Sequence, residues 1–214
     1  MLIAIDNIFA YDFLTNAFVA CVLSGITCGI VGSYIVARRM VFLSSGITHA
    51  SFGGLGIALY AGIDPLLGAL AFASLSSLGI EYSSRQGRIR EDSAIGIIWS
   101  VGMAIGALFM SLRPGYATDL TSYLFGNILL VTRTDIVWLA VLTFFMVVGA
   151  VVWLRKLMYI TFDEDYAQSQ GIRVALVAYI MAIVIALTIV MSIKVMGIIL
   201  LLSLITIPVV IANT

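Results

Sequence analysis

The chain has 214 residues, of which 62% are hydrophobic and only 10% are charged, and its mean hydropathy is +1.16. An ordinary soluble domain carries about 25% charged residues, so a soluble fold is excluded because too few charges remain to cover a water-facing surface. Eleven basic and eleven acidic residues balance each other, and net charge gives no indication of a nucleic-acid partner. The composition predicts an all-α, polytopic transmembrane helical bundle in contact with membrane lipid.

Apolar runs bounded by charged or turn residues predict about seven spans, because a helix crosses the hydrocarbon core with about 20 apolar residues. The second run is too short to cross alone, so we expect a short or broken helix that begins as irregular backbone near Gly46 and His49. The polar stretch from Pro114 to Thr134 is interpreted as a re-entrant or interfacial segment. Residues 1–214 are predicted to form a single transmembrane domain with spans at 13–37, 50–62, 65–82, 94–112, 135–154, 173–193 and 195–212.

The basic residues predict an extracytoplasmic N-terminus in the cell membrane, because Lys and Arg near span ends are retained on the cytoplasmic side. In this orientation the three outer basic residues are Arg113, Arg133 and Lys194. The inner ones are Arg38, Arg39, Arg85, Arg88, Arg90, Arg155, Lys156 and Arg173.

His49 is the single histidine of the chain and lies in the stretch FLSSGITHASFGG. A neutral imidazole is a good ligand for a first-row divalent metal, although hydrogen-bonded packing is the alternative for a lone histidine. A ligand role requires carboxylates nearby, and the candidates are Glu91 and Asp92, directly before the fourth predicted span. Asp92 is also interpretable as a helix cap that never meets an ion.

The stretch TFDEDYAQSQG, residues 161–171, predicts a short amphipathic helix with acids at its start and Gly171 as its stop. On the side assigned as cytoplasmic, such a helix suits docking into another protein. A helix lying on the membrane surface is the alternative, but it would carry Lys and Arg on its polar face rather than three acids.

Five stretches in this order resemble the permease subunits of the metal-importing ABC-3 family: GSYIVARRMVFLSSGITHASFGGLGIA, REDSAIGIIWSVGMAIGALF, DLTSYLFGNIL, TFDEDYAQSQGI and SIKVMGIILLLSLITIPVVIA. This family takes up zinc, manganese or iron together with a separate ATPase and an extracytoplasmic metal-binding protein. The chain has no G-x-x-x-x-G-K-[ST] phosphate-binding pattern. We therefore expect a transporter subunit rather than an enzyme, with ATP hydrolysis in a partner subunit.

The resemblance implies a homodimeric permease without a permanently bound cofactor, in which the divalent metal ion is the transported substrate. It also implies that the stretch TFDEDYAQSQGI is the coupling helix seated on the cytoplasmic ATPase. The coupling residues implied in this way are Phe162, Asp163, Glu164, Tyr166, Ala167 and Gly171.

The same resemblance places the translocation path near His49. Relatives typically read G-D-A-x-S-H-A here, with an acid four residues before the histidine, whereas this chain has Ser45. An acid and a histidine at this spacing share a helical face and grip an ion jointly, but a serine offers only a neutral oxygen. Three alternatives stay open: a weaker site, compensation by Asp92, or a different or chelated metal. The candidate metal residues are His49, Asp92 and Ser45.

Relatives continue beyond IPVVIAN with a further span, so the resemblance implies that the last span of the family is missing here. The alternatives to a metal-ion permease are a permease for a chelated metal or vitamin, and a non-transporting membrane scaffold or truncated remnant. An intramembrane enzyme is disfavoured, because His49 has neither a nucleophile partner nor an H-E-x-x-H pattern around it.

Overall fold

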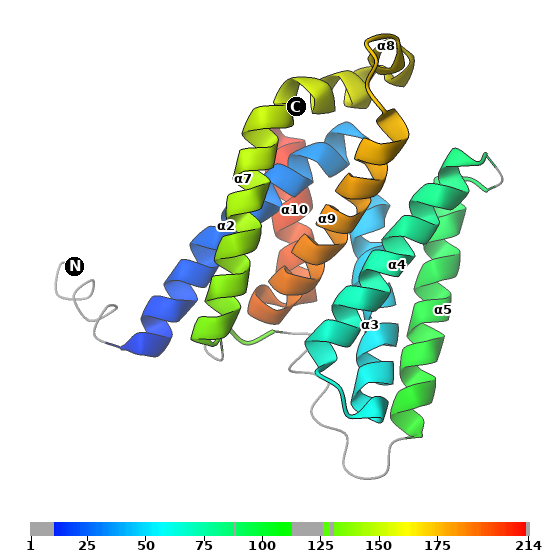
Figure 1. Ribbon diagram of the computed structural model, residues 1–214. Helices are drawn as coiled ribbons and strands as arrows, with labels where there is room; N and C mark the ends of the chain where they lie inside the picture. The colour runs from blue at the N-terminus through cyan, green and yellow to red at the C-terminus, as the bar shows by residue number, and fades with distance from the viewer. Residues whose placement is uncertain (1–10, 88, 113–125, 129–130, 213–214) are drawn as a thin grey trace. The chain divides into compact units, whose positions relative to one another are not determined.

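The computed structural model describes residues 11–87, 89–112, 126–128 and 131–212, and these ranges are helical without any strand. Within these ranges, six helices are long and apolar enough to span a membrane, which confirms the predicted all-α polytopic fold. They are α2 (Asp12–Ala37), α3 (Val41–Ala61), α4 (Pro65–Arg85), α5 (Glu91–Ser111), α7 (Arg133–Phe162) and α9 (Val174–Met196) (Figure 1). Two shorter helices are α8 (Glu164–Ser169) and α10 (Ile198–Ala212).

The seventh predicted span is the short apolar helix α10, whose 15 residues fall below the length of a full span. The predicted re-entrant segment falls largely on residues 113–125 and 129–130, which lie outside the described ranges. Its end differs from the prediction, because α7 already begins at Arg133.

The expected short or broken second helix is wrong. α3 is a continuous helix of 21 residues from Val41, and both Gly46 and His49 lie within it. Its hydroxyl groups donate to backbone carbonyls one turn earlier: Thr48 Oγ1 to Ser44 at 2.7 Å and Ser51 Oγ to Thr48 at 2.6 Å. These two hydroxyl groups are thus satisfied within the helix, so they do not interrupt its backbone.

The ends of α3 and α4 follow from local chemistry. α3 stops at Gly62, which adopts a left-handed conformation with φ of 72° and donates its N–H to the Ala58 carbonyl. α4 starts with Pro65, and the Asp64 carboxylate accepts the Leu66 N–H at 2.8 Å as an N-cap. The turn between these helices is therefore specified by Gly62, Asp64 and Pro65.

The chain forms two compact units. The first unit comprises the described residues of Met1–Ser33, Asp119–Leu154 and Met191–Thr214, and the second those of Tyr34–Thr118 and Arg155–Val190. In the first unit, buried Asp135 at the start of α7 accepts from Lys194 Nζ of α9 at 2.6 Å. This ion pair fastens the ends of two helices together.

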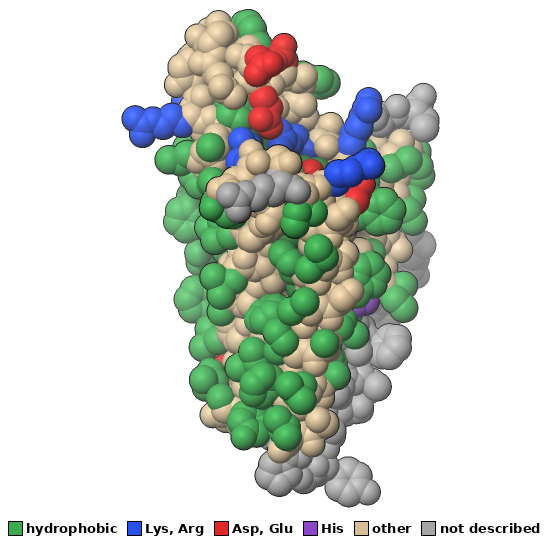
Figure 2. Space-filling view, turned by 90° about the vertical axis from the view of Figure 1, so that its right-hand side faces the viewer, with side chains coloured by type: hydrophobic (Ala, Val, Ile, Leu, Met, Phe, Trp, Pro, Cys, Tyr) green, Lys and Arg blue, Asp and Glu red, His purple; other side chains and the backbone are tan. Residues whose placement is uncertain are grey.

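Helices α3, α4 and α5 of the second unit approach one another through glycines. A Cβ added at Gly56 would lie 2.7 Å from the carbonyl oxygen of Gly106, and one added at Gly54 would lie 2.7 Å from the carbonyl carbon of Gly68. Only glycine permits such backbone contact between helices. Hydrophobic side chains spread over the flank of the helices in Figure 2, and charged ones gather near helix ends. That distribution suits a surface covered by lipid.

Candidate functional site

The candidate metal residues Ser45 and His49 lie one turn apart on α3, and both are half-buried. The imidazole of His49 stacks on the indole of Trp99 from α5, with ring centroids 4.5 Å apart and planes only 4° from parallel. The two rings fix the orientation of the imidazole on this face of α3. Trp99 was not predicted from the sequence, since nothing in the spacing along the chain pairs it with His49.

Asp92, the third candidate, lies elsewhere along α5. It is exposed in the first turn, seven residues before Trp99 and thus about 10.5 Å away along the helix axis. The N-cap position is Arg90, where no side chain forms a capping hydrogen bond, so Asp92 is not the cap of this helix. The structure therefore places Ser45 and His49 together and Asp92 about two turns away from the level of the stacked rings.

The ligand set around His49 is sparse. Within the described ranges, no group of three or more His, Cys, Asp and Glu residues is arranged to hold a metal ion. Ser45 and His49 together offer one hydroxyl and one imidazole. This pair is better suited to transient binding of a metal ion than a closed set of four tetrahedral ligands would be.

The candidate coupling segment consists of the last residues of α7, the short helix α8 and Gly171. Thr161 and Phe162 complete α7 rather than beginning the new helix, which differs from the prediction. Asp163 is the N-cap of α8, and its carboxylate accepts the Tyr166 N–H at 2.9 Å. Gly171 ends the segment with φ of 75°, as its role as a stop predicts.

Ala167 is the buried anchor of α8. It is 0% exposed and packs with Ile160 of α7 and Val174 of α9. On the same helix, the ring of Tyr166 meets that of Tyr159 edge to face, with centroids 5.4 Å apart. Ala167 thus holds α8 on the second unit, and a partner protein would contact its exposed neighbours instead.

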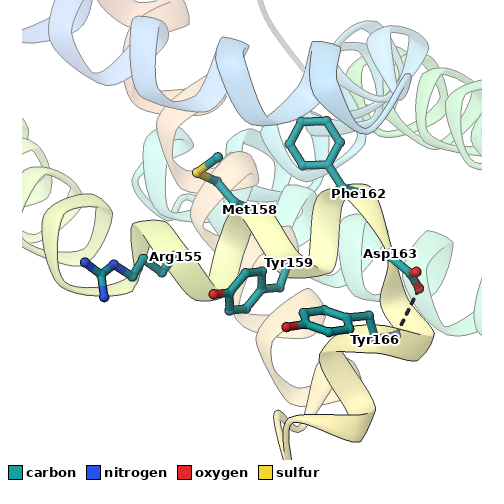
Figure 3. Close-up of a pocket in the computed structure, with 6 residues that line it drawn as sticks. All are labelled: Arg155, Met158, Tyr159, Phe162, Asp163 and Tyr166. Carbon is teal, nitrogen blue, oxygen red and sulfur yellow. Dashed lines mark hydrogen bonds between the residues drawn. The ribbon is translucent and has the colours of Figure 1, made fainter.

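An exposed hollow of about 390 Å³ lies between the last turns of α7 and α8 (Figure 3). Tyr159 and Phe162 line it from α7, Tyr166 lines it from α8, and Asp163 lies between the two helices. Phe162 is 81% exposed, which is unusual for a phenylalanine of a folded domain. The remaining lining residues are Arg155 and Met158, which share one face of α7 with Tyr159 and Phe162.

An ionic cluster joins Glu164 of α8 to Arg38 and Arg85. The Glu164 carboxylate accepts a hydrogen bond from Arg38, directly after α2, and lies 3.6 Å from Arg85 Nη2 at the end of α4. Arg85 Nε in turn donates to Glu81 at 2.5 Å. Burial lowers the pKa of Arg38, but neighbouring Tyr34 and Glu164 outweigh burial and raise this pKa above its ordinary value. The Arg38 guanidinium therefore stays charged.

The cluster brings together three distant parts of the sequence, since Arg38 and Glu164 alone are 126 positions apart. The prediction that Arg38, Arg85 and residues 161–171 share one side of the membrane was the single sequence signal for it. Sequence reasoning did not anticipate that Glu164 itself joins the two arginines.

These features define the class of the protein: a multi-pass, all-helical membrane protein with a short, capped helix beside the charged ends of its spans. The chain matches the ABC-3 family, described as the ABC 3 transport family, over residues 10–214. It belongs to this family.

Several relatives align over almost the whole chain. An uncharacterized membrane protein of Synechocystis sp. is 37% identical over 213 residues, covering 100% of this chain and 76% of the relative. The manganese transport system membrane protein MntC of Halalkalibacterium halodurans is 33% identical, covering 95% of this chain and 70% of the relative. Among solved structures, PsaBC from Streptococcus pneumoniae in complex with Fab has a TM-score of 0.83 at 29% identity, covering 100% of this chain and 77% of that chain.

Proposed function

We propose that the chain is the permease subunit of an ATP-binding-cassette importer for divalent metal ions such as manganese, zinc or iron. Membership of the ABC 3 transport family and similarity to a relative named as a manganese transport protein support the class of substrate. In this proposal, a cytoplasmic ATPase subunit hydrolyses ATP, an extracytoplasmic protein delivers the metal, and two copies of the chain form the path.

The observation that carries the proposal is the surface of α8. Its anchor Ala167 points into the second unit, whereas Phe162 and Tyr166 remain exposed beside the hollow. Exposed aromatic rings with a polar rim are typical of protein interfaces. We assign this surface, together with Asp163 and Gly171 that shape it, to contact with the ATPase.

His49 and Ser45 are proposed to face the translocation path, with Asp92 as an acid nearer the cytoplasmic end of α5. The half-buried imidazole is held by Trp99 and supplies one borderline ligand, which suits transient binding. The metal ion is the transported substrate, and it leaves when the path opens to the other side.

A crosslinking experiment tests the docking surface. Gln168 is exposed on α8 next to the buried anchor. In a chain with Cys21→Ser and Cys28→Ser, the Gln168→Cys variant should crosslink to a co-expressed ATPase subunit, whereas Thr134→Cys, exposed at the start of α7, should not. Absence of a crosslink at Gln168 in a folded complex would contradict the proposal.

Transport is tested with the reconstituted complex. Bare Mn²⁺ delivered by the binding protein should stimulate ATP hydrolysis and enter proteoliposomes. Stimulation by a chelated metal alone would instead support the permease for a chelate. Absence of stimulation by either substrate would support the scaffold.

A further inference from the structure

The carboxylate of Glu164 joins α8 to two other parts of the second unit. It accepts from Arg38 in the turn after α2 and lies 3.6 Å from Arg85 Nη2 at the end of α4. The side chains of Arg38 and Arg85 are only 16% and 21% exposed, so water screens these ion pairs less than it screens ordinary surface pairs. One carboxylate on a six-residue helix thus engages two guanidinium groups.

Arg38 lies at the entrance of the helix that carries the candidate metal residues. Only Arg39 and Met40 separate it from the first residue of α3, and Arg39 holds the turn in a left-handed conformation with φ of 59°. Arg38 Nη1 also donates to the Ile160 carbonyl of α7 at 3.4 Å. A displacement of Glu164 would therefore pull directly on the start of α3.

Arg85 leads to the same helix by a second route. It is bonded to Glu81 one turn earlier on α4, and α4 touches α3 backbone to backbone at Gly68 and Gly54. Close-packed elements transmit displacement because they have no free space to absorb it. Both ion pairs of Glu164 thus lead to α3, one through its first turn and one through its flank.

Among the described residues, the other contacts of α8 do not involve Arg38 or Arg85. The burial of Ala167 and the Tyr159–Tyr166 contact hold α8 to α7 and α9, and the Asp163 cap closes the first turn of α8 itself. Throughout the described part of the chain, the ion pairs from α8 to Arg38 and Arg85 all pass through Glu164. Loss of this side chain would leave α8 folded and attached but separated from the two arginines.

We infer that Glu164 is a positioning residue that transmits the movement of α8 to α3, the helix of Ser45 and His49. The inference rests on the proposed function, because it presumes that an ATPase moves α8. Without the Glu164 carboxylate, the ATPase binds α8 and hydrolyses ATP, but α3 no longer follows the movement. The specific loss is metal transported per ATP hydrolysed.

The test uses the complete transporter in proteoliposomes, with Mn²⁺ uptake and ATP hydrolysis measured on the same sample. Glu164→Ala is compared with Asp165→Ala, which removes the same charge from an exposed neighbour that forms no ion pair among the described residues. In Glu164→Ala, Mn²⁺ uptake per ATP should fall about fivefold or more, the lower end of typical coupling between sites. Asp165→Ala should keep the original ratio.

Crosslinking at Gln168→Cys separates a relay from simple docking. The crosslink to the ATPase should persist in Glu164→Ala, and adding Arg38→Gln should lower the transport ratio little further, because both changes cut one link. An unchanged ratio with the crosslink intact would overturn the relay while leaving the docking surface in place. Parallel loss of crosslink and ratio would assign Glu164 to docking and also overturn the relay. Failure of the crosslink with Glu164 present would overturn docking and relay together.

Discussion

The orientation of the His49 imidazole is set by its stacking on Trp99. Stacking on Trp99 fixes the plane of the imidazole, and Ser45 lies one turn earlier on the same helix. The ligand role and a packing role make different forecasts for these three residues. The two roles can be distinguished by experiment, because one substitution removes the imidazole and another removes the Trp99 ring on which it stacks.

His49→Ala should abolish most metal uptake per folded molecule, because it removes the imidazole ligand. Trp99→Leu should retain measurable uptake, since the imidazole remains, although the lost ring contact costs about 0.5–1.5 kcal/mol of stability. Uptake into proteoliposomes and thermal unfolding in detergent measure the two effects. Equal losses of stability in both variants with normal uptake would establish packing as the role of His49.

Ser45→Asp should tighten the binding of bare Mn²⁺ by about tenfold, or about 1.4 kcal/mol, because a carboxylate attracts a dication more strongly than a hydroxyl does. Transport should be equal or slower, since a tightly held ion leaves slowly. Ser45→Asn is the neutral control of the same shape. Calorimetric titration across pH checks the prediction, and equal affinities of the Asp and Asn variants would remove Ser45 from the site.

The sequence predicted which residues form the candidate site, but it did not predict which side chains lie beside them. The i, i+4 spacing of Ser45 and His49 follows from any continuous helix, so their shared face was available from the sequence. The stacking partner Trp99 and the distance of Asp92 depend on how α5 packs against α3, which local spacing does not encode. For the same reason, Glu164 was recognised as part of a docking helix but not as the partner of Arg38.

At the scale of elements, α3 shows how membrane helices tolerate polar side chains. Its hydroxyls bond to carbonyls of the preceding turn, and its glycines allow close contact with α4 and α5. The hydropathy pattern predicted a short helix, because it takes no account of the hydrogen bonds that the hydroxyls form or of the helix contacts that the glycines allow. Helix ends marked by local signals, such as the Asp64 cap and Gly171, were better determined by the sequence.

Gly56→Ala should destabilise the contact between α3 and α5, because the added methyl group would lie 2.7 Å from a backbone oxygen that has no rotamer to change. The expected cost is about 1–3 kcal/mol or more. Gly96→Ala on α5 is the matched control, since nothing lies within 4 Å of its added Cβ, and it should be neutral or stabilising. Thermal unfolding in detergent compares the two, and equal stability would contradict the close approach.

Asp163→Ala should fray α8 by removing the cap of a helix that has only six residues. The cap is worth about 1 kcal/mol, whereas Asp163→Asn preserves the acceptor and should preserve the helix. Faster hydrogen exchange of the amides of residues 164–169 in the Ala variant measures this loss. Unchanged protection would show that burial of Ala167 alone maintains α8.

At the scale of the molecule, the sequence specified the membrane class and most of the spans, because hydrophobic length is a property of single segments. The two-unit organisation depends on contacts between distant segments and was not anticipated. Orientation in the membrane stays a prediction from the basic residues. The contacts among Arg38, Arg85 and Glu164 agree with the expected grouping of these residues on one side.

Labelling of intact cells tests this orientation. In the chain without its native cysteines, Thr134→Cys should react with a membrane-impermeant maleimide from outside, and Gln168→Cys should react only after permeabilisation. Both positions are exposed, so differences in reactivity report sidedness rather than burial. The reverse pattern would invert the topology and move α8 to the outer side.

The glycine contacts of the second unit also determine where an ion is unable to travel. A seam that leaves no room for a methyl group leaves none for a cation carrying its hydration shell, or even for a single water molecule, which needs about 10–15 Å³. At Gly54–Gly68 and at Gly56–Gly106, the helices therefore leave no room for an ion or a water molecule between them. In the proposed transporter, we therefore expect the metal ion to pass beside these contacts rather than between the helices at Gly54 and Gly56.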